Sequence, residues 1–234
     1  MRNKLKGRIV LLGLIAALSA CSRTKQARKV EEPEKSLLGI DYSMLHEGKD
    51  GQALRVYNSG EDLSRFHKLI LDPIVIAPPE GAKEDDLADL KKISDDAAAK
   101  FKKELSDDWT LVGDPGPDVL RLQIGFYDPD KRWVGVNAIS SVMPIGMGLS
   151  MIKNASTGKP SAVGELTAEG KLTDSSNGKL YLAALDRRVA NKYTKGAFSR
   201  WGDVEYAIDF YSKAVRYRLC EQAHRGNCVK PESE

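Results

Sequence analysis

Residues 163–189, VGELTAEGKLTDSSNGKLYLAALDRRV, carry the most regular pattern in this chain of 234 residues. From 164 to 172, small or apolar residues alternate with polar ones, which is the period of a strand with two different faces. Asn177-Gly178 is the turn signal of a tight hairpin, and residues 179–189 supply its returning strand. The pattern therefore predicts an antiparallel pair of strands in the second half of the chain.

The segments around this hairpin supply further strands and two helices. Residues 68–77 and 119–128 are apolar or alternating, as strands are. Residues 84–105 carry an apolar stripe that opens with acidic residues and closes with lysines, and Asp203 begins a last helix that runs to about Cys220. We expect a two-layer α+β fold: a four- to five-stranded, mostly antiparallel sheet covered by two helices, in the order β-α-β-β-(apolar insert)-β-β-α.

Residues 1–20 indicate an export signal. Four cations precede an uncharged run over residues 9–18, and Ser19 and Ala20 follow it. The run of about ten residues is too short to cross the roughly 30 Å of bilayer hydrocarbon as a helix. The chain is therefore expected to be exported and cut after this segment.

The residues at the cut, LSAC at 18–21, look like a bacterial lipobox. In that motif a diacylglyceryl group joins the cysteine thiol, here that of Cys21, and a dedicated peptidase cuts before it. An ordinary secretory signal with an accidental cysteine is the alternative. Several acyl chains anchor a protein stably, whereas one does so only marginally. Ser22 follows in place of Asp, which in such lipoproteins implies the outer membrane.

Composition divides the rest of the chain. We expect a flexible, solvated tether over residues 21–36, an irregular docked segment over 37–65, a core domain over 66–222 and a tail over 223–234.

A series of short motifs runs through the mature chain: DYSML at 41–45, LDP at 71–73, DPGP at 114–117, LRL at 120–122, PIG at 144–146, TGK at 157–159, GE at 164–165, DRR at 186–188 and WGD at 201–203. Together they resemble a family of uncharacterised lipoproteins of Gram-negative bacteria that is known only as a domain of unknown function. The resemblance implies a lipid anchor and an envelope location, and it supplies no chemistry. The expected topology also looks like that of periplasmic lipoprotein domains from envelope secretion and assembly systems.

Residues 133–152 form a run of twenty residues without a charge, between two expected strands. Pro144 and several glycines make a membrane-spanning helix a poor interpretation. A buried crossover, a protein interface and a hairpin inserted into the membrane all stay open, although apolar runs usually belong to the core. Contact residues in the second and third cases would include Trp133, Ile145, Gly146 and Gly148.

Arg187 and Arg188 follow Asp186 at the end of an expected strand, with Lys192, Lys195 and Arg200 beyond them. Arginine suits both lipid phosphates and acidic protein surfaces, so Arg187 and Arg188 are candidate contacts. The alternative is a solvated face in which Asp186 pairs with a neighbouring arginine.

Cys220, His224 and Cys228 are spaced four residues apart. On a continuous helix they would lie on one face and could hold a metal. In an oxidising compartment a Cys220–Cys228 disulfide is the stronger expectation, and we expect no metal. Eight helical residues span about 12 Å, whereas a disulfide needs Cα atoms within about 7 Å, so the helix would have to end before Gly226.

The balanced charge of the chain and the absence of catalytic motifs argue against several classes of function. Without the four cations of the signal, 32 basic residues face 33 acidic ones, which argues against a nucleic-acid partner. No nucleophile elbow, zinc-protease motif or phosphate loop is present, so we expect no enzyme and no cofactor. The expectation is an outer-membrane lipoprotein on the periplasmic face that acts by binding, as an accessory or structural part of the envelope, with a protein partner or a second copy of itself. The alternative is an oligomeric lipoprotein that forms a membrane pore with residues 133–152.

The lipid anchor is directly testable. Cys21→Ser should release the protein from membranes and leave the signal uncut, because the thiol that accepts the lipid is gone. Metabolic labelling with an acyl-chain analogue should mark the parent and not the variant. Equal labelling of both would rule out lipidation at Cys21.

Overall fold

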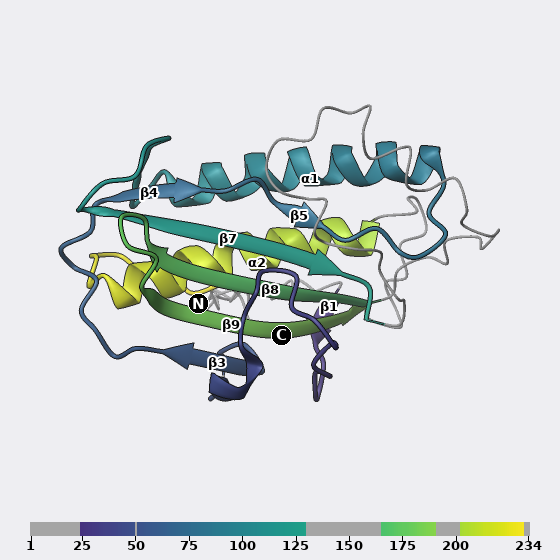
Figure 1. The fold of residues 1–234 in the computed structure, drawn as a ribbon, viewed down its shortest axis with the longest axis horizontal. Coiled ribbons are helices and arrows are strands. Elements are labelled where there is room, and N and C mark those ends of the chain that lie inside the picture. The colour runs from purple at the N-terminus through teal and green to yellow at the C-terminus, as the bar shows by residue number, and fades with distance from the viewer. Residues whose placement is uncertain (1–23, 50, 130–164, 191–201, 232–234) are drawn as a thin grey trace, which may run out of the picture.

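The structure, a computed structural model, describes residues 24–49, 51–129, 165–190 and 202–231. In these residues one β-sheet carries two α-helices on one of its faces (Figure 1). The elements are β1 (Thr24–Gln26), a 3₁₀ turn (Tyr42–Met44), β2 (His46–Glu47), β3 (Arg55–Asn58), β4 (Lys68–Leu71), β5 (Val75–Ile76), α1 (Glu84–Leu105), β6 (Thr110–Leu111), β7 (Val119–Tyr127), β8 (Glu165–Asp174), β9 (Leu180–Ala190) and α2 (Gly202–Gln222).

The sheet is built on three long antiparallel strands, β7, β8 and β9. Its order is β2-β3-β9-β8-β7-β4-β6, with β1 also on β9 and β5 also on β7. The strands β4 and β5 run parallel to β7, so the sheet is mixed but mostly antiparallel. The α+β fold class is confirmed. The nine strands of the described residues exceed the expected four to five because several strands are only two to four residues long, too short to show a period in the sequence.

The expected strand over residues 68–77 is interrupted at Pro73. Leu71 lies opposite Leu122 and Val75 opposite Gly125, so β4 and β5 together carry one residue more than β7 does between the same points. This is the geometry of a bulge, which removes the need for an N–H that proline lacks. The Asp72 carboxylate accepts hydrogen bonds from Arg121 at 2.7 Å and from Gln123 at 3.1 Å and holds the interruption against β7.

The main core lies between the sheet and the helices. The inward residues of β7 that the alternation predicts are all buried: Leu120, Leu122, Ile124 and Phe126. The helix α1 buries its stripe of Leu90, Ile93, Ala97, Phe101 and Leu105 against them. The rings of Phe101, Phe126 and Tyr211 follow one another across this core, and α2 lies beside α1. The core thus joins both helices to one face of the sheet.

The opposite face of the sheet is covered by the chain between Ser36 and Leu45. At its centre lies Glu169 of β8, which is 1% exposed. Its carboxylate accepts hydrogen bonds from the Ser36 hydroxyl at 2.6 Å, from the Leu37 N–H at 3.1 Å and from the Leu38 N–H at 3.0 Å.

The fourth donor is the Tyr42 hydroxyl, 2.5 Å from the Glu169 carboxylate. Burial and this hydrogen bond raise the pKa of Tyr42, so the hydroxyl keeps its proton and donates it. The apolar neighbours Leu37, Ile40 and Leu45 pack against Tyr127 and Leu185 of the sheet. This part of the expected docked segment therefore lies against the domain, and residues later in the segment contribute β2 and β3 to the sheet itself.

The tether expected over residues 21–36 needs a correction. Residues Thr24–Gln26 form β1, which pairs with β9 from Thr24 opposite Ala190 to Gln26 opposite Arg188. Thr24 is 4% exposed. A strand of three residues escapes prediction because its partner, about 160 residues later in the chain, supplies the reason for it.

Replacing Glu169 should loosen the covering segment. Glu169→Gln removes the charge and turns one acceptor into a donor, so we expect the free energy of unfolding to fall by about 1.5–3 kcal/mol. The matched control is Glu61→Gln, since Glu61 pairs with Lys179 on the surface and such exposed pairs contribute roughly 0–1 kcal/mol. Urea unfolding of both variants measures the difference. Equal small losses would show that the Glu169 cluster does not hold the segment.

Candidate functional site

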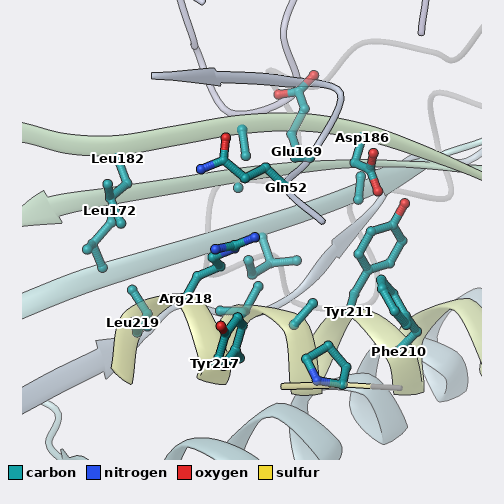
Figure 2. A pocket seen from close by; sticks show the side chains of 18 of the residues that line it. Gln52, Glu169, Leu172, Leu182, Asp186, Phe210, Tyr211, Tyr217, Arg218 and Leu219 are labelled. Atoms are coloured by element: carbon teal, nitrogen blue, oxygen red, sulfur yellow. The ribbon is translucent and has the colours of Figure 1, made fainter. Parts of the chain in front are cut away.

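A cavity of about 350 Å³ interrupts the core between α2 and the helix-facing side of the β8–β9 hairpin (Figure 2). Its floor is made of Ala168 and Gly170 on β8 and Ala184 on β9, and Gly170 lies directly opposite Ala184. These three adjacent positions carry at most a methyl group. At these three positions the sheet therefore has no large side chain that could fill the space below the helix.

The roof is the middle of α2. Near its start the helix buries Val204 and Ile208, and near its end it buries Leu219. Between these contacts Ala214 and Val215 face the cavity and are only half-buried. The helix is thus packed on the sheet at both ends, while its middle spans the patch of small residues.

One end of the cavity is polar and is centred on Asp186 of β9, which is 6% exposed. Its carboxylate accepts hydrogen bonds from the Gln26 side chain at 2.7 Å and from the Leu54 N–H at 3.1 Å. Burial raises the pKa of Asp186, and these hydrogen bonds oppose the rise. The Tyr211 hydroxyl points at this carboxylate (Figure 2), in an arrangement looser than an ordinary hydrogen bond.

The two arginines that follow Asp186 face opposite sides of the sheet. Arg188 is 3% exposed, donates to the Thr24 hydroxyl at 3.1 Å and carbonyl at 2.7 Å, and lies 3.6 Å from the ring centre of Phe210. Arg187 forms an ion pair with Glu165. Both guanidiniums are therefore engaged within the chain. Arg188 in particular is an interior residue, which corrects the expectation that it could contact a partner or lipid, whereas Arg187 is partly exposed.

The mouth of the cavity carries two cations beside Gly51. The Arg218 guanidinium donates to the Gly51 carbonyl and to Glu221, the latter at 2.8 Å. The Lys230 ammonium lies near the same glycine: a Cβ atom on Gly51 would be 3.5 Å from Lys230 Nζ and 3.8 Å from Arg218 Nη2. Within the described residues Lys230 makes no ion pair. The cavity thus opens between the loop at Gly51 and the C-terminal tail.

The Cys220–Cys228 disulfide holds that tail in place. The two Cα atoms are 5.5 Å apart, and α2 ends at Gln222, before Gly226, as the geometry required. The disulfide is confirmed. His224 lies outside the helix with a φ of 50°, and no group of residues in the described ranges could hold a metal. Because Cys228 is fixed to α2, the tail passes Lys230 and Pro231 along the mouth.

Several candidate residues lie outside the described ranges: Cys21, Trp133, Ile145, Gly146, Gly148, Lys192, Lys195 and Arg200. No helix in the described part of the chain is both long and apolar enough for a membrane span.

The cavity was not predicted from the sequence, although a signal exists. Three small residues fall on the helix-facing positions of two adjacent strands, and Asp186 falls on the same face. A charged residue and three residues with at most a methyl side chain are unusual together on a core face. Recognising them required the register of the hairpin and the position of α2, which the sequence alone does not supply.

The lining determines what this arrangement can do. Apolar residues, mainly alanine, leucine and phenylalanine, form much of the walls, and none of the described lining residues is Ser, Thr, Cys or His. The cavity therefore offers apolar contact, hydrogen bonds at Asp186 and cations at its mouth. These groups suit the binding of a partly apolar molecule.

Comparisons with known proteins place the chain among proteins without an assigned activity. A family model described as "Protein of unknown function (DUF3313)" matches residues 34–215, which agrees with the expected resemblance to an uncharacterised family. The comparison with curated proteins gives no significant match.

Two of the solved structures that are similar at low identity illustrate the likeness. A PelC dodecamer from Paraburkholderia phytofirmans is 14% identical with a TM-score of 0.34, and the match covers 73% of this chain and 96% of that one. A DUF4136 family protein from Bacteroides thetaiotaomicron is 11% identical with a TM-score of 0.32, and the match covers 67% of this chain and 93% of that one. At these scores neither likeness supports an argument about function or assembly.

The disulfide should stabilise the domain measurably. Closing a loop of about nine residues contributes roughly 2.5 kcal/mol in the chain-entropy account, so reductant should lower the free energy of unfolding by about that amount. The double variant Cys220→Ala/Cys228→Ala should unfold at the same urea concentration as the reduced parent and should not respond to reductant. Two freely alkylated thiols in protein prepared without reductant would contradict the bond.

Proposed function

Because the chain belongs to the DUF3313 family of proteins of unknown function, we propose its function from its own residues: it is a lipid-anchored binding protein of the bacterial cell envelope, and the cavity below α2 is its ligand site. One observation carries the proposal, namely the open apolar cavity of about 350 Å³ in the middle of an otherwise packed core. Its size lies in the range of about 300–1,000 Å³ that is typical of small-molecule sites.

The energetic cost of the cavity supports a binding role. Protein cores are close-packed, and empty apolar space lowers stability. A larger side chain at Gly170, Ala184 or Ala214 would fill this space; a Cβ atom on Gly170, for example, would meet only Ile124, at an ordinary 3.6 Å. The chain leaves the space open although one methyl or isobutyl group would reduce it. A ligand that enters the cavity recovers the lost contacts.

The lipobox at Cys21 supports the envelope location, and Ser22 supports the outer membrane. The position of β1 is relevant as well, because this strand begins at Thr24, three residues after Cys21. Three extended residues reach about 10 Å. An acylated Cys21 would therefore keep the domain, and the Gln26 end of its cavity, close to the membrane surface, on the periplasmic side.

A protein partner or a second copy of the chain stays part of the proposal as a further role in the envelope. The residues first considered for such an interface, Trp133, Ile145, Gly146 and Gly148, lie outside the described ranges. The same holds for the pore-forming alternative, which depends on residues 133–152, and no contact among the described residues favours it.

Filling the cavity tests the proposal. The test protein is the mature chain, residues 21–234, with Cys21→Ser so that no acyl chain is present. An environment-sensitive apolar dye should fluoresce on binding to it, and Ala184→Leu should lower the affinity at least tenfold because leucine occupies the floor. The free energy of unfolding of that variant should stay equal or rise by about 0.5–2 kcal/mol, because changes that fill a cavity commonly stabilise a protein by this amount.

The matched control is Ala99→Leu, at an exposed position of α1, which should bind the dye like the parent. If the parent binds no apolar dye, or if Ala184→Leu binds it as tightly as Ala99→Leu does, the cavity is not a ligand site.

A further inference from the structure

We propose that the cavity below α2 takes a single-chain amphiphile with an anionic head group, its alkyl chain in the core and its head at Arg218 and Lys230. The inference rests on the proposed binding function and names the ligand class of that same site.

The interior of the cavity suits an alkyl chain. Several of the wall residues are aliphatic or aromatic: Phe101, Leu122, Ile124, Leu172, Leu182 and Leu219. Burying a CH₂ group against such walls contributes about 0.8 kcal/mol. A volume of about 350 Å³ lies near the lower end of the usual range for ligand sites, which suits one chain rather than the two of a phospholipid.

The mouth suits an anion. Arg218 Nη2 and Lys230 Nζ both lie within 4 Å of the Cβ position of Gly51, so the two cations are neighbours. Glu221 compensates Arg218 through the 2.8 Å ion pair, and within the described residues no carboxylate pairs with Lys230. Neighbouring like charges repel each other, and an anion between them reverses the sign of that energy. A carboxylate or phosphate also accepts the remaining N–H groups of both side chains.

The polar end of the cavity gives an anionic head no net attraction. Asp186 lies there, and its carboxylate already accepts hydrogen bonds from Gln26 and the Leu54 N–H. Arg188 lines the same end, and its positive charge acts on Asp186. The two opposite charges offset each other there, so Arg218 and Lys230 are the groups that attract an anionic head. Figure 2 shows Asp186 beside Tyr211 and apart from Arg218, which lies beside Leu219 in the C-terminal part of α2. The head group is therefore placed at the mouth, with the chain below the helix.

Photo-crosslinking in vesicles tests this with the full lipidated protein. The probes share one diazirine-bearing chain of sixteen carbons and differ in their heads: palmitate, lysophosphatidate, hexadecanol and hexadecylammonium. Mass spectrometry measures the label on peptides of α2, normalised to the label on vesicle lipid. The anionic probes should mark α2 about tenfold more than hexadecylammonium, the effect of about 1.4 kcal/mol. Preference for palmitate or for lysophosphatidate identifies the head as carboxylate or phosphate.

Variants assign the effect to residues. Lys230→Gln and Arg218→Gln should each reduce labelling by the anionic probes severalfold and leave hexadecanol unchanged. Lys213→Gln, at an exposed lysine of α2 that pairs with Asp209, is the matched control and should change nothing. Ala184→Leu should abolish labelling of α2 by every probe.

The outcomes separate the two claims. Equal labelling of α2 by all four probes, lost in Ala184→Leu, would keep the binding function and overturn the anionic head. An anionic preference that survives in both Lys230→Gln and Arg218→Gln would overturn the assignment to the mouth. No labelling of α2 by any probe, or labelling that persists in Ala184→Leu, would overturn the proposed function itself.

Discussion

A carboxylate buried at the centre of a sheet requires hydrogen-bond donors. In this chain that requirement determines the path of the N-terminal third. Glu169 of β8 is buried on the face away from the helices, where an unpaired charge would be very costly. The donors come from the chain between Ser36 and Tyr42, which lies across β8 to reach it. This path covers the second face of the sheet with apolar side chains and lets the segments before and after it pair with β9 as β1 and β3. A half-exposed sheet thereby becomes one that is buried on both faces.

On the face that carries the helices the packing is incomplete, because several side chains of the sheet are too small to fill the space below α2. The helix α2 packs at both ends, and the half-buried Ala214 and Val215 between them line the cavity together with Gly170 and Ala184. The disulfide then fixes the tail beside that opening, and the tail supplies Lys230. The floor, the roof and the Lys230 charge thus come from three separate parts of the chain: the hairpin β8–β9, the helix α2 and the residues after Cys228. A covalent bond, and not packing alone, sets the position of the residues after Cys228.

How well an element could be predicted depends on how many residues its sequence pattern spans. The bounds of α1 were predicted to the residue, since a 22-residue stripe with acids at one end and lysines at the other leaves little freedom. The β8–β9 hairpin and the Cys220–Cys228 bond were also predicted, the first from Asn177-Gly178 and the second from the oxidising compartment that the export signal implies. The strands β1 and β3 were missed because a few residues carry no period, and both depend on β9 far along the chain.

The roles of Glu169 and Asp186 were missed because a carboxylate in an alternating strand normally indicates a face exposed to solvent. Only the register and the covering segments show that both are interior.

The short distance between Cys21 and β1 has a consequence for how the protein would meet its ligand. A domain on a long flexible leader samples a wide volume, and its local concentration at the surface falls steeply with leader length. Here β1 begins three residues after Cys21. An acylated chain would therefore be confined to a thin layer over the bilayer. Amphiphiles partition into that same layer. Encounter would then be a two-dimensional search at high effective concentration, and even a weak intrinsic affinity for a lipid-like molecule would keep the site occupied.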